Sequence, residues 1–206
     1  MTAALLAFDG SRIDGGLYTD VTDAAHRAPH WLDHAILLWS DYGLALFALL
    51  MLAAWWLGRR RGPAATAQAL AVPLIVVLAY SVNSVLKSLV AEDRPCRSIP
   101  RAFTLETCPG AGDWSFPSNH TVISFAAAAA LLLVHRRLGA VAVLAALAMG
   151  ASRVWIGVHY PHDVLAGALL GVAVAIPLTL AARRAAPLVA RGRRTALAPL
   201  LGTGTG

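Results

Sequence analysis

Charged side chains are scarce in this sequence: only 14% of its 206 residues are Asp, Glu, Lys or Arg, whereas soluble domains contain about 25%. Lysine occurs once and cysteine twice, while hydrophobic residues make up 58% of the chain. A net charge of +6 would suggest a nucleic-acid partner in a soluble protein. With so little polar surface, however, a soluble enzyme, a disordered chain and a nucleic-acid-binding domain are all excluded.

The hydrophobic residues fall into long blocks. Crossing the hydrocarbon core of a bilayer takes about 20 mostly apolar residues. Five blocks approach or reach this length, and we expect them to be membrane spans: His34–Leu57, Ala64–Lys87, Phe116–Val134, Gly139–Gly157 and Val164–Ala182. The sequence therefore predicts an all-α membrane protein, a bundle of about five transmembrane helices forming one domain over residues 1–190.

The two ends of the chain are less apolar. Residues Ile13–Ala25 have apolar side chains at helical spacing, which predicts an interfacial helix on the outer membrane surface; a solvated leader is the alternative. No signal peptide is expected, because the first residues lack a basic segment and their apolar run stops at Asp9. Residues 191–206 end in Gly-Thr-Gly-Thr-Gly and are predicted to be a disordered tail.

Basic residues set the expected orientation. Ten of the seventeen lie in the segments after spans one, three and five, which contain no acidic residue: Arg59, Arg60, Arg61, Arg136, Arg137, Arg183, Arg184, Arg191, Arg193 and Arg194. Cytoplasmic loops are enriched in such residues. We therefore expect the C-terminus inside, and the N-terminus, the Glu92–Ser115 loop and the Val158–Asp163 turn outside. All eleven acidic residues lie toward that outer side.

Three polar clusters occur at the outer ends of the apolar spans: at the end of span two, at the start of span three, and between spans four and five. Their chemically useful members are Lys87 and Arg94, then Ser118, Asn119 and His120, then Arg153, His159 and Asp163. Because they share one membrane depth, we expect them to converge on one pocket. Arginine and lysine bind phosphate oxygens, and helix N-termini add N–H groups for an anion. The sequence predicts a phosphate or diphosphate site.

Two histidines suggest a reaction at this site. Asp163 follows His159 by four residues, and a carboxylate on one ring nitrogen leaves the other as a nucleophile. His120 can serve as the general acid. The three cations supply the positive charge, so neither a metal nor another cofactor is expected. The remaining histidines are interpreted as ordinary interfacial side chains: His26, His30, His34, His135 and His162.

Both cysteines, Cys96 and Cys108, lie in the same outer loop. Outside the membrane a disulfide can persist, and here it would close a loop of about a dozen residues and stabilise the fold by roughly 3 kcal/mol. Two free thiols are the alternative. No metal-ligand spacing involves either cysteine.

The three clusters resemble the signature of the PAP2 (type 2 phosphatidic acid phosphatase) superfamily, K-x6-R-P, P-S-G-H and S-R-x5-H-x3-D, with every internal spacing kept. The resemblance implies a phosphohistidine intermediate on His159, oriented by Asp163, with His120 as the acid. It assigns the phosphate cradle to Lys87, Arg94, Ser118, Asn119 and Arg153. Asn119 stands where the family usually has Gly; Asn tolerates the left-handed conformation, so we expect activity to survive.

Within the superfamily the chain is similar to the bacitracin-resistance type of undecaprenyl-diphosphate phosphatase, in Ser115-Phe116-Pro117-Ser118 and in the segment 152–161. This implies hydrolysis of undecaprenyl diphosphate at the outer face of a bacterial cell membrane, with no nucleic-acid partner. The alternatives are a phosphatase for phosphatidylglycerophosphate, phosphatidate or a prenyl-phosphoryl sugar, and a non-catalytic lipid transporter or binder. Against the last, binding alone needs neither a nucleophile nor an acid.

Overall fold

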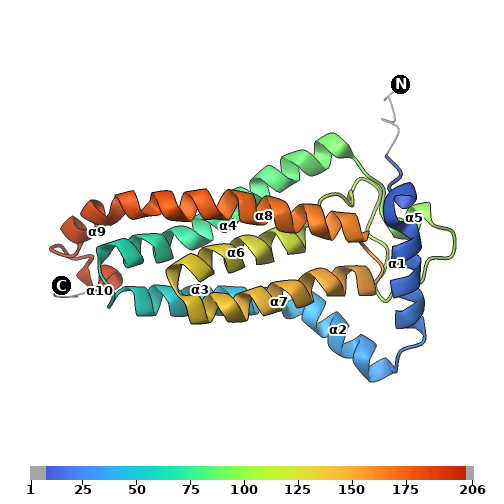
Figure 1. Ribbon diagram of the computed structural model, residues 1–206, viewed down its shortest axis with the longest axis horizontal. Helices are drawn as coiled ribbons and strands as arrows, with labels where there is room; N and C mark the ends of the chain where they lie inside the picture. The colour runs from blue at the N-terminus through green and yellow to red at the C-terminus, as the bar shows by residue number, and fades with distance from the viewer. Residues whose placement is uncertain (1–7, 203–206) are drawn as a thin grey trace.

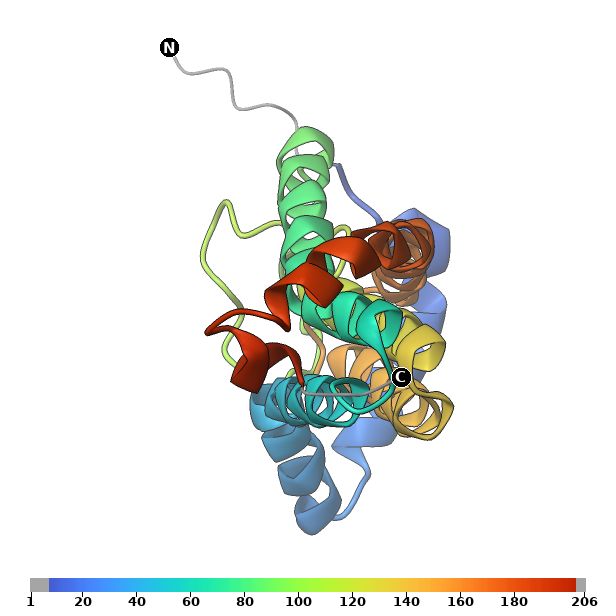
Figure 2. The same ribbon diagram turned by 90° about the vertical axis from the view of Figure 1, so that its left-hand side faces the viewer.

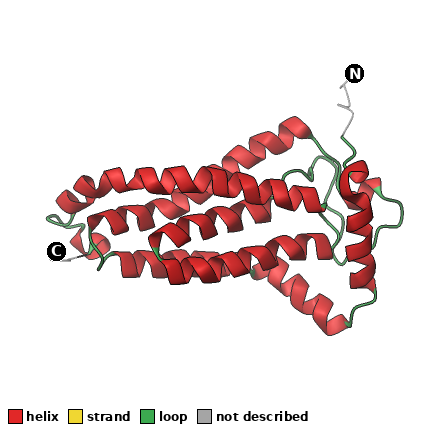
Figure 3. Ribbon diagram, in the orientation of Figure 1, coloured by secondary structure: helices red, strands yellow, loops and turns green. Residues whose placement is uncertain are grey.

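The computed structural model describes residues 8–202, and these contain helices and no β-strand (Figures 1 and 3). The predicted all-α fold is confirmed. The elements are α1 (Ser11–His26), α2 (His30–Tyr42), α3 (Leu44–Gly58), α4 (Pro63–Val90), α5 (Pro95–Ser98), α6 (Asn119–Val134), α7 (Arg136–Trp155), α8 (Pro161–Ala181), the 3-10 helix η1 (Ala182–Ala185), α9 (Ala186–Gly192) and α10 (Ala198–Leu201).

Helix α6 forms the centre of the bundle and packs against α3, α4, α7 and α8. Its interior positions are small, with Ala126, Ala127 and Ala130 fully buried. Small side chains let neighbouring helices approach closely where the surrounding lipid offers no hydrophobic drive. Gly171 of α8 is one such position, because a Cβ there would lie 2.6 Å from the carbonyl oxygen of Val122.

All five predicted spans contain helix, but two of them are not simple crossing helices. By length and composition, three helices in the described residues can cross a membrane: Pro63–Val90, Arg136–Trp155 and Pro161–Gly192. The pair α2 and α3 passes as a fourth, although it is bent by 50°. Helix α6 has 16 residues, about 24 Å, which is shorter than the ~30 Å hydrocarbon core.

The bend between α2 and α3 occurs at Gly43. A Cβ at this position would lie 2.4 Å from the carbonyl oxygen of Trp39 and 2.8 Å from Met149 Cε, so a larger residue would clash with the backbone of α2. Beyond the bend, α2 diverges from the bundle axis, and it leads back to α1 (Figure 1). The second half of α4 also diverges (Figures 1 and 2), leaving Val85 and Leu89 exposed by 59% and 75%.

Helix α1 includes the predicted interfacial segment Ile13–Ala25 and lies across one end of the bundle (Figure 1). It contacts α5, α7 and α8, and Tyr18 is fully buried with its hydroxyl donating to the carbonyl oxygen of Gly157 at 2.9 Å. The alternative of a solvated leader is therefore wrong, because α1 is docked by its buried face while Ile13 and Leu17 remain exposed.

The opposite end of the bundle, which faces the viewer in Figure 2, contains the ten arginines of the predicted cytoplasmic segments. Here the chain folds back after α9. Arg193 donates to the carbonyl oxygens of Leu201 and Arg59, each at 3.0 Å, and Trp55 Nε1 donates to Leu200 at 3.0 Å. A disordered segment was predicted from residue 191; instead, residues 191–202 pack against α3 and α4, and only 203–206 of it lie outside the described residues.

The close contact of α6 with α8 gives a stability prediction. We expect Gly171→Ala to destabilise the protein by about 1–3 kcal/mol, because a backbone carbonyl cannot yield to the new methyl group. Gly16→Ala, on α1 with nothing within 4 Å of its Cβ, is the matched control and should leave stability unchanged or slightly higher. Thermal unfolding in detergent measures the stability of both variants. Equal melting temperatures for Gly171→Ala and Gly16→Ala would contradict a close contact between α6 and α8 at Gly171.

Candidate active site

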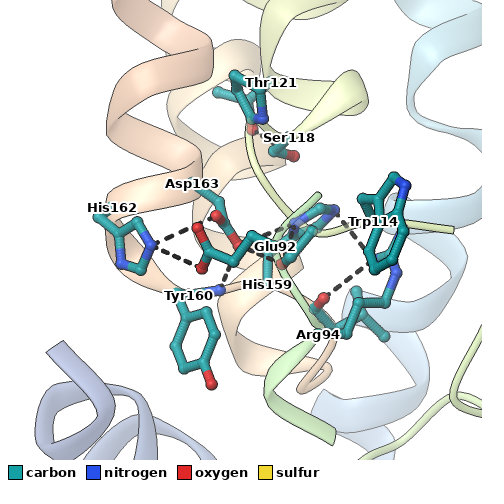
Figure 4. A network of polar contacts seen from close by, with 12 residues as sticks. Glu92, Arg94, Trp114, Ser118, Thr121, His159, Tyr160, His162 and Asp163 are labelled. Atoms are coloured by element: carbon teal, nitrogen blue, oxygen red, sulfur yellow. Dashed lines mark hydrogen bonds and ion pairs between the residues drawn. The ribbon is translucent and has the colours of Figure 1, made fainter. Parts of the chain in front are cut away.

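The α1 end of the bundle brings the three polar clusters together. Lys87 lies in the last turn of α4 and Arg94 just before α5, while Arg153 lies in the last turn of α7. His159 and Asp163 flank the start of α8, beside the start of α6 (Figure 4). All five side chains are buried.

His159 is held between a carboxylate and a cation. Its Nδ1 lies 3.2 Å from Asp163 Oδ2, and its Nε2 lies 3.3 Å from Arg94 Nη1. Burial, followed by the positive charges of Arg94 and Arg153, lowers the pKa of His159 well below its ordinary value. The ring is therefore neutral near pH 7, and its Nδ1 proton, held by the carboxylate, leaves Nε2 with a lone pair facing the cations.

Asp163 is oriented by the start of α8. Pro161 is the first residue of this helix and Asp163 the third, positions that favour proline and a carboxylate. Its Oδ2 accepts hydrogen bonds from the Tyr160 backbone N–H at 2.8 Å and from the Ser115 hydroxyl at 2.5 Å. The carboxylate that fixes the nucleophile is thus itself fixed from two directions.

The three cations reach the pocket from different elements. Lys87 Nζ donates to the carbonyl oxygens of Trp114 and Ser115. Arg94 donates to the carbonyl oxygen of Val158 at 2.9 Å and pairs with Asp113 at 2.9 Å. These bonds hold the loop that follows α5 over the site.

Arg153 is less completely paired than Arg94. Its Nη1 donates to the Ser40 hydroxyl at 2.5 Å and lies 3.8 Å from Glu106 Oε2. Arg153 Nε and Glu106 Oε2 are buried without a hydrogen-bond partner among the described residues. A buried unpaired donor is costly, so the guanidinium offers a free N–H to an incoming anion.

The start of α6 contributes Ser118, Asn119 and His120. Ser118 Oγ accepts from Thr121 Oγ1 at 3.0 Å, which leaves its own proton free to donate. The charge of His120 is among the smaller causes that lower the pKa of His159.

The backbone conformation of Asn119 differs from the expected one. It is the first residue of α6, and among the described non-glycine residues only Ala91 and Arg101 have positive φ. The left-handed conformation considered for Asn119 is therefore wrong, because the helix has already begun there. Its Oδ1 accepts from the buried amide of Asn83 at 2.6 Å, so its side chain ties α6 to α4.

Several residues of the site were missed by sequence reasoning. Ser115 is fully buried and binds Asp163, and Glu92 is 1% exposed. His162, interpreted above as an interfacial side chain, lies between carboxylates of Asp14 and Glu92. A serine or a lone histidine has no local signal for such contacts, which join residues far apart in the chain.

The loop over the site is closed by a disulfide. Cys96 and Cys108 are bonded, with their Cα atoms 6.0 Å apart. This loop includes Glu106, which faces Arg153. The bond restricts the unfolded chain and thereby stabilises the loop.

Side-chain nitrogen and oxygen atoms of Glu92, His162 and Asp163 lie within 4.8 Å of one another in the part of the chain that the structure describes. The rest of the pocket has the composition of an anion site, with three buried cations around a neutral imidazole. This arrangement suits attack by the His159 Nε2 atom on phosphorus, with the cations on the phosphoryl oxygens.

Comparisons with known proteins agree with this chemistry. The family model described as PAP2 superfamily matches residues 68–186. The chain is 30% identical over 159 residues to undecaprenyl-diphosphatase BcrC of Bacillus subtilis (strain 168), covering 75% of this chain and 79% of that protein. It is 39% identical over 100 residues to the bacitracin transport permease protein BcrC of Bacillus licheniformis, an alignment spanning 48% of each chain.

Solved structures share the fold. The crystal structure of Aquifex aeolicus LpxE superposes with a TM-score of 0.60 and 25% identity, covering 84% of this chain and 98% of that one. A transmembrane PAP2 type phosphatidylglycerolphosphate phosphatase from Bacillus subtilis gives a TM-score of 0.59 at 20% identity, covering 82% of this chain and 86% of that one.

Ser115 provides a test of how the nucleophile is oriented. We expect Ser115→Ala to reduce kcat for phosphate release about tenfold or more, because a hydrogen bond to a charged group contributes about 1.5–3 kcal/mol. Ser81→Ala is the matched control, since this exposed hydroxyl of α4 only binds the Val77 carbonyl of its own helix. Equal rates for the two variants would exclude a role for Ser115.

Proposed function

The chain belongs to the PAP2 superfamily and is a membrane phosphatase, and from this premise we propose that it hydrolyses undecaprenyl diphosphate to undecaprenyl phosphate and inorganic phosphate. The observation that supports the phosphatase chemistry most is the buried, neutral His159, with its Nε2 facing the guanidinium of Arg94. The choice of lipid is supported by the similarity to the Bacillus subtilis undecaprenyl-diphosphatase.

In the first proposed step, Nε2 of His159 attacks the terminal phosphorus. The N–P bond forms while the P–O bond to the lipid phosphate breaks, and His120 gives its proton to the leaving oxygen. Asp163 keeps the Nδ1 proton and stabilises the positive charge of the phosphohistidine. In the second step, water gives its proton to His120 and attacks phosphorus, which releases phosphate and restores His159.

The cations bind the phosphoryl oxygens during both steps. Lys87, Arg94 and Arg153 offset the charge on these oxygens in the transition state; the Ser118 hydroxyl and the start of α6, including Asn119, complete the cradle. Asp113 and Glu106 now face Arg94 and Arg153. A phosphate entering the pocket would replace both carboxylates, and it would pair with the free Nε of Arg153.

The lipid reaches the site from the membrane. The prenyl tail would remain among the surrounding lipids, while the diphosphate enters the polar pocket at the α1 end. The arginine-rich opposite end supports an outer position for the site and the N-terminus, because basic segments stay in the cytoplasm. The C-terminus would then be cytoplasmic, and residues 1–190 would act as one phosphatase domain in the bacterial cell membrane.

A substrate panel tests this proposal. We expect His159→Ala to reduce phosphate release in detergent at least about a thousandfold, because no nucleophile remains, while the exposed His34→Ala stays near wild type. We expect kcat/KM to be higher for undecaprenyl diphosphate than for phosphatidylglycerophosphate, phosphatidate or a prenyl-phosphoryl sugar.

The panel also separates the alternatives. Preference for a glycerophospholipid would keep the chemistry and refute the prenyl substrate. Binding of lipid phosphate with no release dependent on His159 would indicate a transporter or lipid binder instead of an enzyme.

The role of His120 can be tested through the leaving group. We expect His120→Ala to reduce hydrolysis of a lipid substrate by about 10²–10⁴. The loss should be much smaller with p-nitrophenyl phosphate, whose leaving group departs without a proton. Steady-state rates on both substrates make the comparison, and an equal loss on both would show that His120 is not the acid.

A further inference from the structure

His162, the second residue of α8, lies beside the carboxylates of Glu92 and Asp163 (Figure 4), and Asp14 of α1 is a third carboxylate next to it. Its Nδ1 is 2.7 Å from Asp14 Oδ1, and its backbone N–H donates to Asp14 Oδ2 at 2.7 Å. Its Nε2 is 2.9 Å from Glu92 Oε1 and 3.6 Å from Asp163 Oδ1. The ring thus connects α1 and the loop before α5 to the carboxylate that orients His159.

These contacts determine where the ring protons lie. An ionised carboxylate only accepts hydrogen bonds, and a neutral imidazole has one donor and one acceptor nitrogen. Since both nitrogens of His162 are within hydrogen-bond distance of a carboxylate, both carry hydrogen. The ring is an imidazolium with Asp14 on one side and Glu92 on the other.

The surroundings make this charge necessary. Glu92 is 1% exposed and Asp163 is fully buried. Asp163 Oδ1 has no hydrogen-bond partner among the described residues, and His162 Nε2 lies 3.6 Å from it, within ion-pair distance. Two neighbouring buried carboxylates are unstable as ions unless a positive charge is close to them.

The chain before α1 covers part of this cluster. A Cβ on Gly10 would lie 2.0 Å from Glu92 Oε1 and 2.9 Å from His162 Cε1. Phe8 exchanges backbone hydrogen bonds with Ala91 and Asp93, at 3.1 and 3.0 Å. The ring of Tyr160 stacks on that of His162, with centroids 5.2 Å apart.

We propose that His162 is a positioning residue which, as an imidazolium held by Asp14, keeps Asp163 ionised and aligned with His159, so that α1 forms part of the active site. The groups facing His162 are Asp14 from α1, Glu92 from the loop, and Asp163 and Tyr160 from the start of α8.

The effect on the reaction rests on the phosphohistidine chemistry proposed above. When Nε2 of His159 bonds to phosphorus, the ring becomes positive and needs a negative Asp163. Without the His162 charge, Glu92 and Asp163 share one buried region with no cation between them, and one of them takes up a proton. A protonated Asp163 no longer accepts the Nδ1 proton, so turnover falls while binding of the phosphate by the arginines remains.

A divalent cation is the alternative to a proton between the side chains of Glu92, His162 and Asp163. The Nε2 to Oε1 separation of 2.9 Å is a normal hydrogen-bond length, which favours a proton at this position. Metal removal is therefore included in the experiment.

The experiment compares Asp14→Asn and His162→Gln with Asp20→Asn, an exposed carboxylate on the same helix. Phosphate release from a lipid phosphate is measured in detergent from about pH 5 to 9, with melting temperatures recorded alongside. We expect both variants to lose at least about tenfold in kcat, with KM within about twofold. The acidic limb of their pH–rate profiles should move to higher pH, and Asp20→Asn should match wild type.

Each other result has a defined meaning. Unchanged kcat and pH profile, even with a lower melting temperature, would reduce the cluster to a structural role and overturn the proposal. If His162→Gln does not fold, the kcat and the pH–rate profile of Asp14→Asn test the proposal on their own. If activity is lost in EDTA and restored by zinc, the proposal is overturned and a bound metal ion takes its place. Activity retained in His159→Ala would instead refute the proposed chemistry.

Discussion

The site depends on one buried charge, the carboxylate of Asp163. A carboxylate without solvent is tolerated only where donors and cations surround it. The Tyr160 backbone N–H, the Ser115 hydroxyl and the His159 ring meet it directly, so the turn between α7 and α8 and the end of the long loop must both converge there. Its remaining oxygen faces His162. The contacts of one side chain thus join the turn between α7 and α8, the end of the long loop and the start of α8.

Buried cations also need polar partners, and this explains how the pocket accommodates its positive charges. Lys87 and Arg94 are satisfied by carbonyl oxygens, which hold the cations without neutralising them. Within the described residues, Asp113 pairs with Arg94, and Glu106 lies 3.8 Å from Arg153. Glu106 belongs to the loop closed by the disulfide and Asp113 lies just beyond it, so both carboxylates lie on the segment between α5 and α6.

The predictable features were those with a local signature in the chain. Apolar blocks predicted the helices, and fixed spacings such as that from His159 to Asp163 predicted which residues line the pocket. At the bend, Gly43 leaves no room for a Cβ against the carbonyl oxygen of Trp39, and no spacing in the sequence encodes this. Asp14 and His162 are 148 residues apart, and the histidine alone looks like any other near a membrane surface. The sequence also could not show that the side chain of Asn119 pairs with Asn83.

The unequal lengths of α4 and α6 have a consequence for the surrounding lipid. Helix α4 has 28 residues, about 42 Å, against a hydrocarbon core of about 30 Å, whereas α6 is short but shielded by its neighbours. A helix longer than the core accommodates by tilting or by thickening the bilayer around it. Because Lys87 lies on the diverging end of α4, bilayer thickness acts on the tilt of the element that bears this cation. We therefore expect the acyl-chain length of the surrounding lipids to affect the position of Lys87 in the pocket.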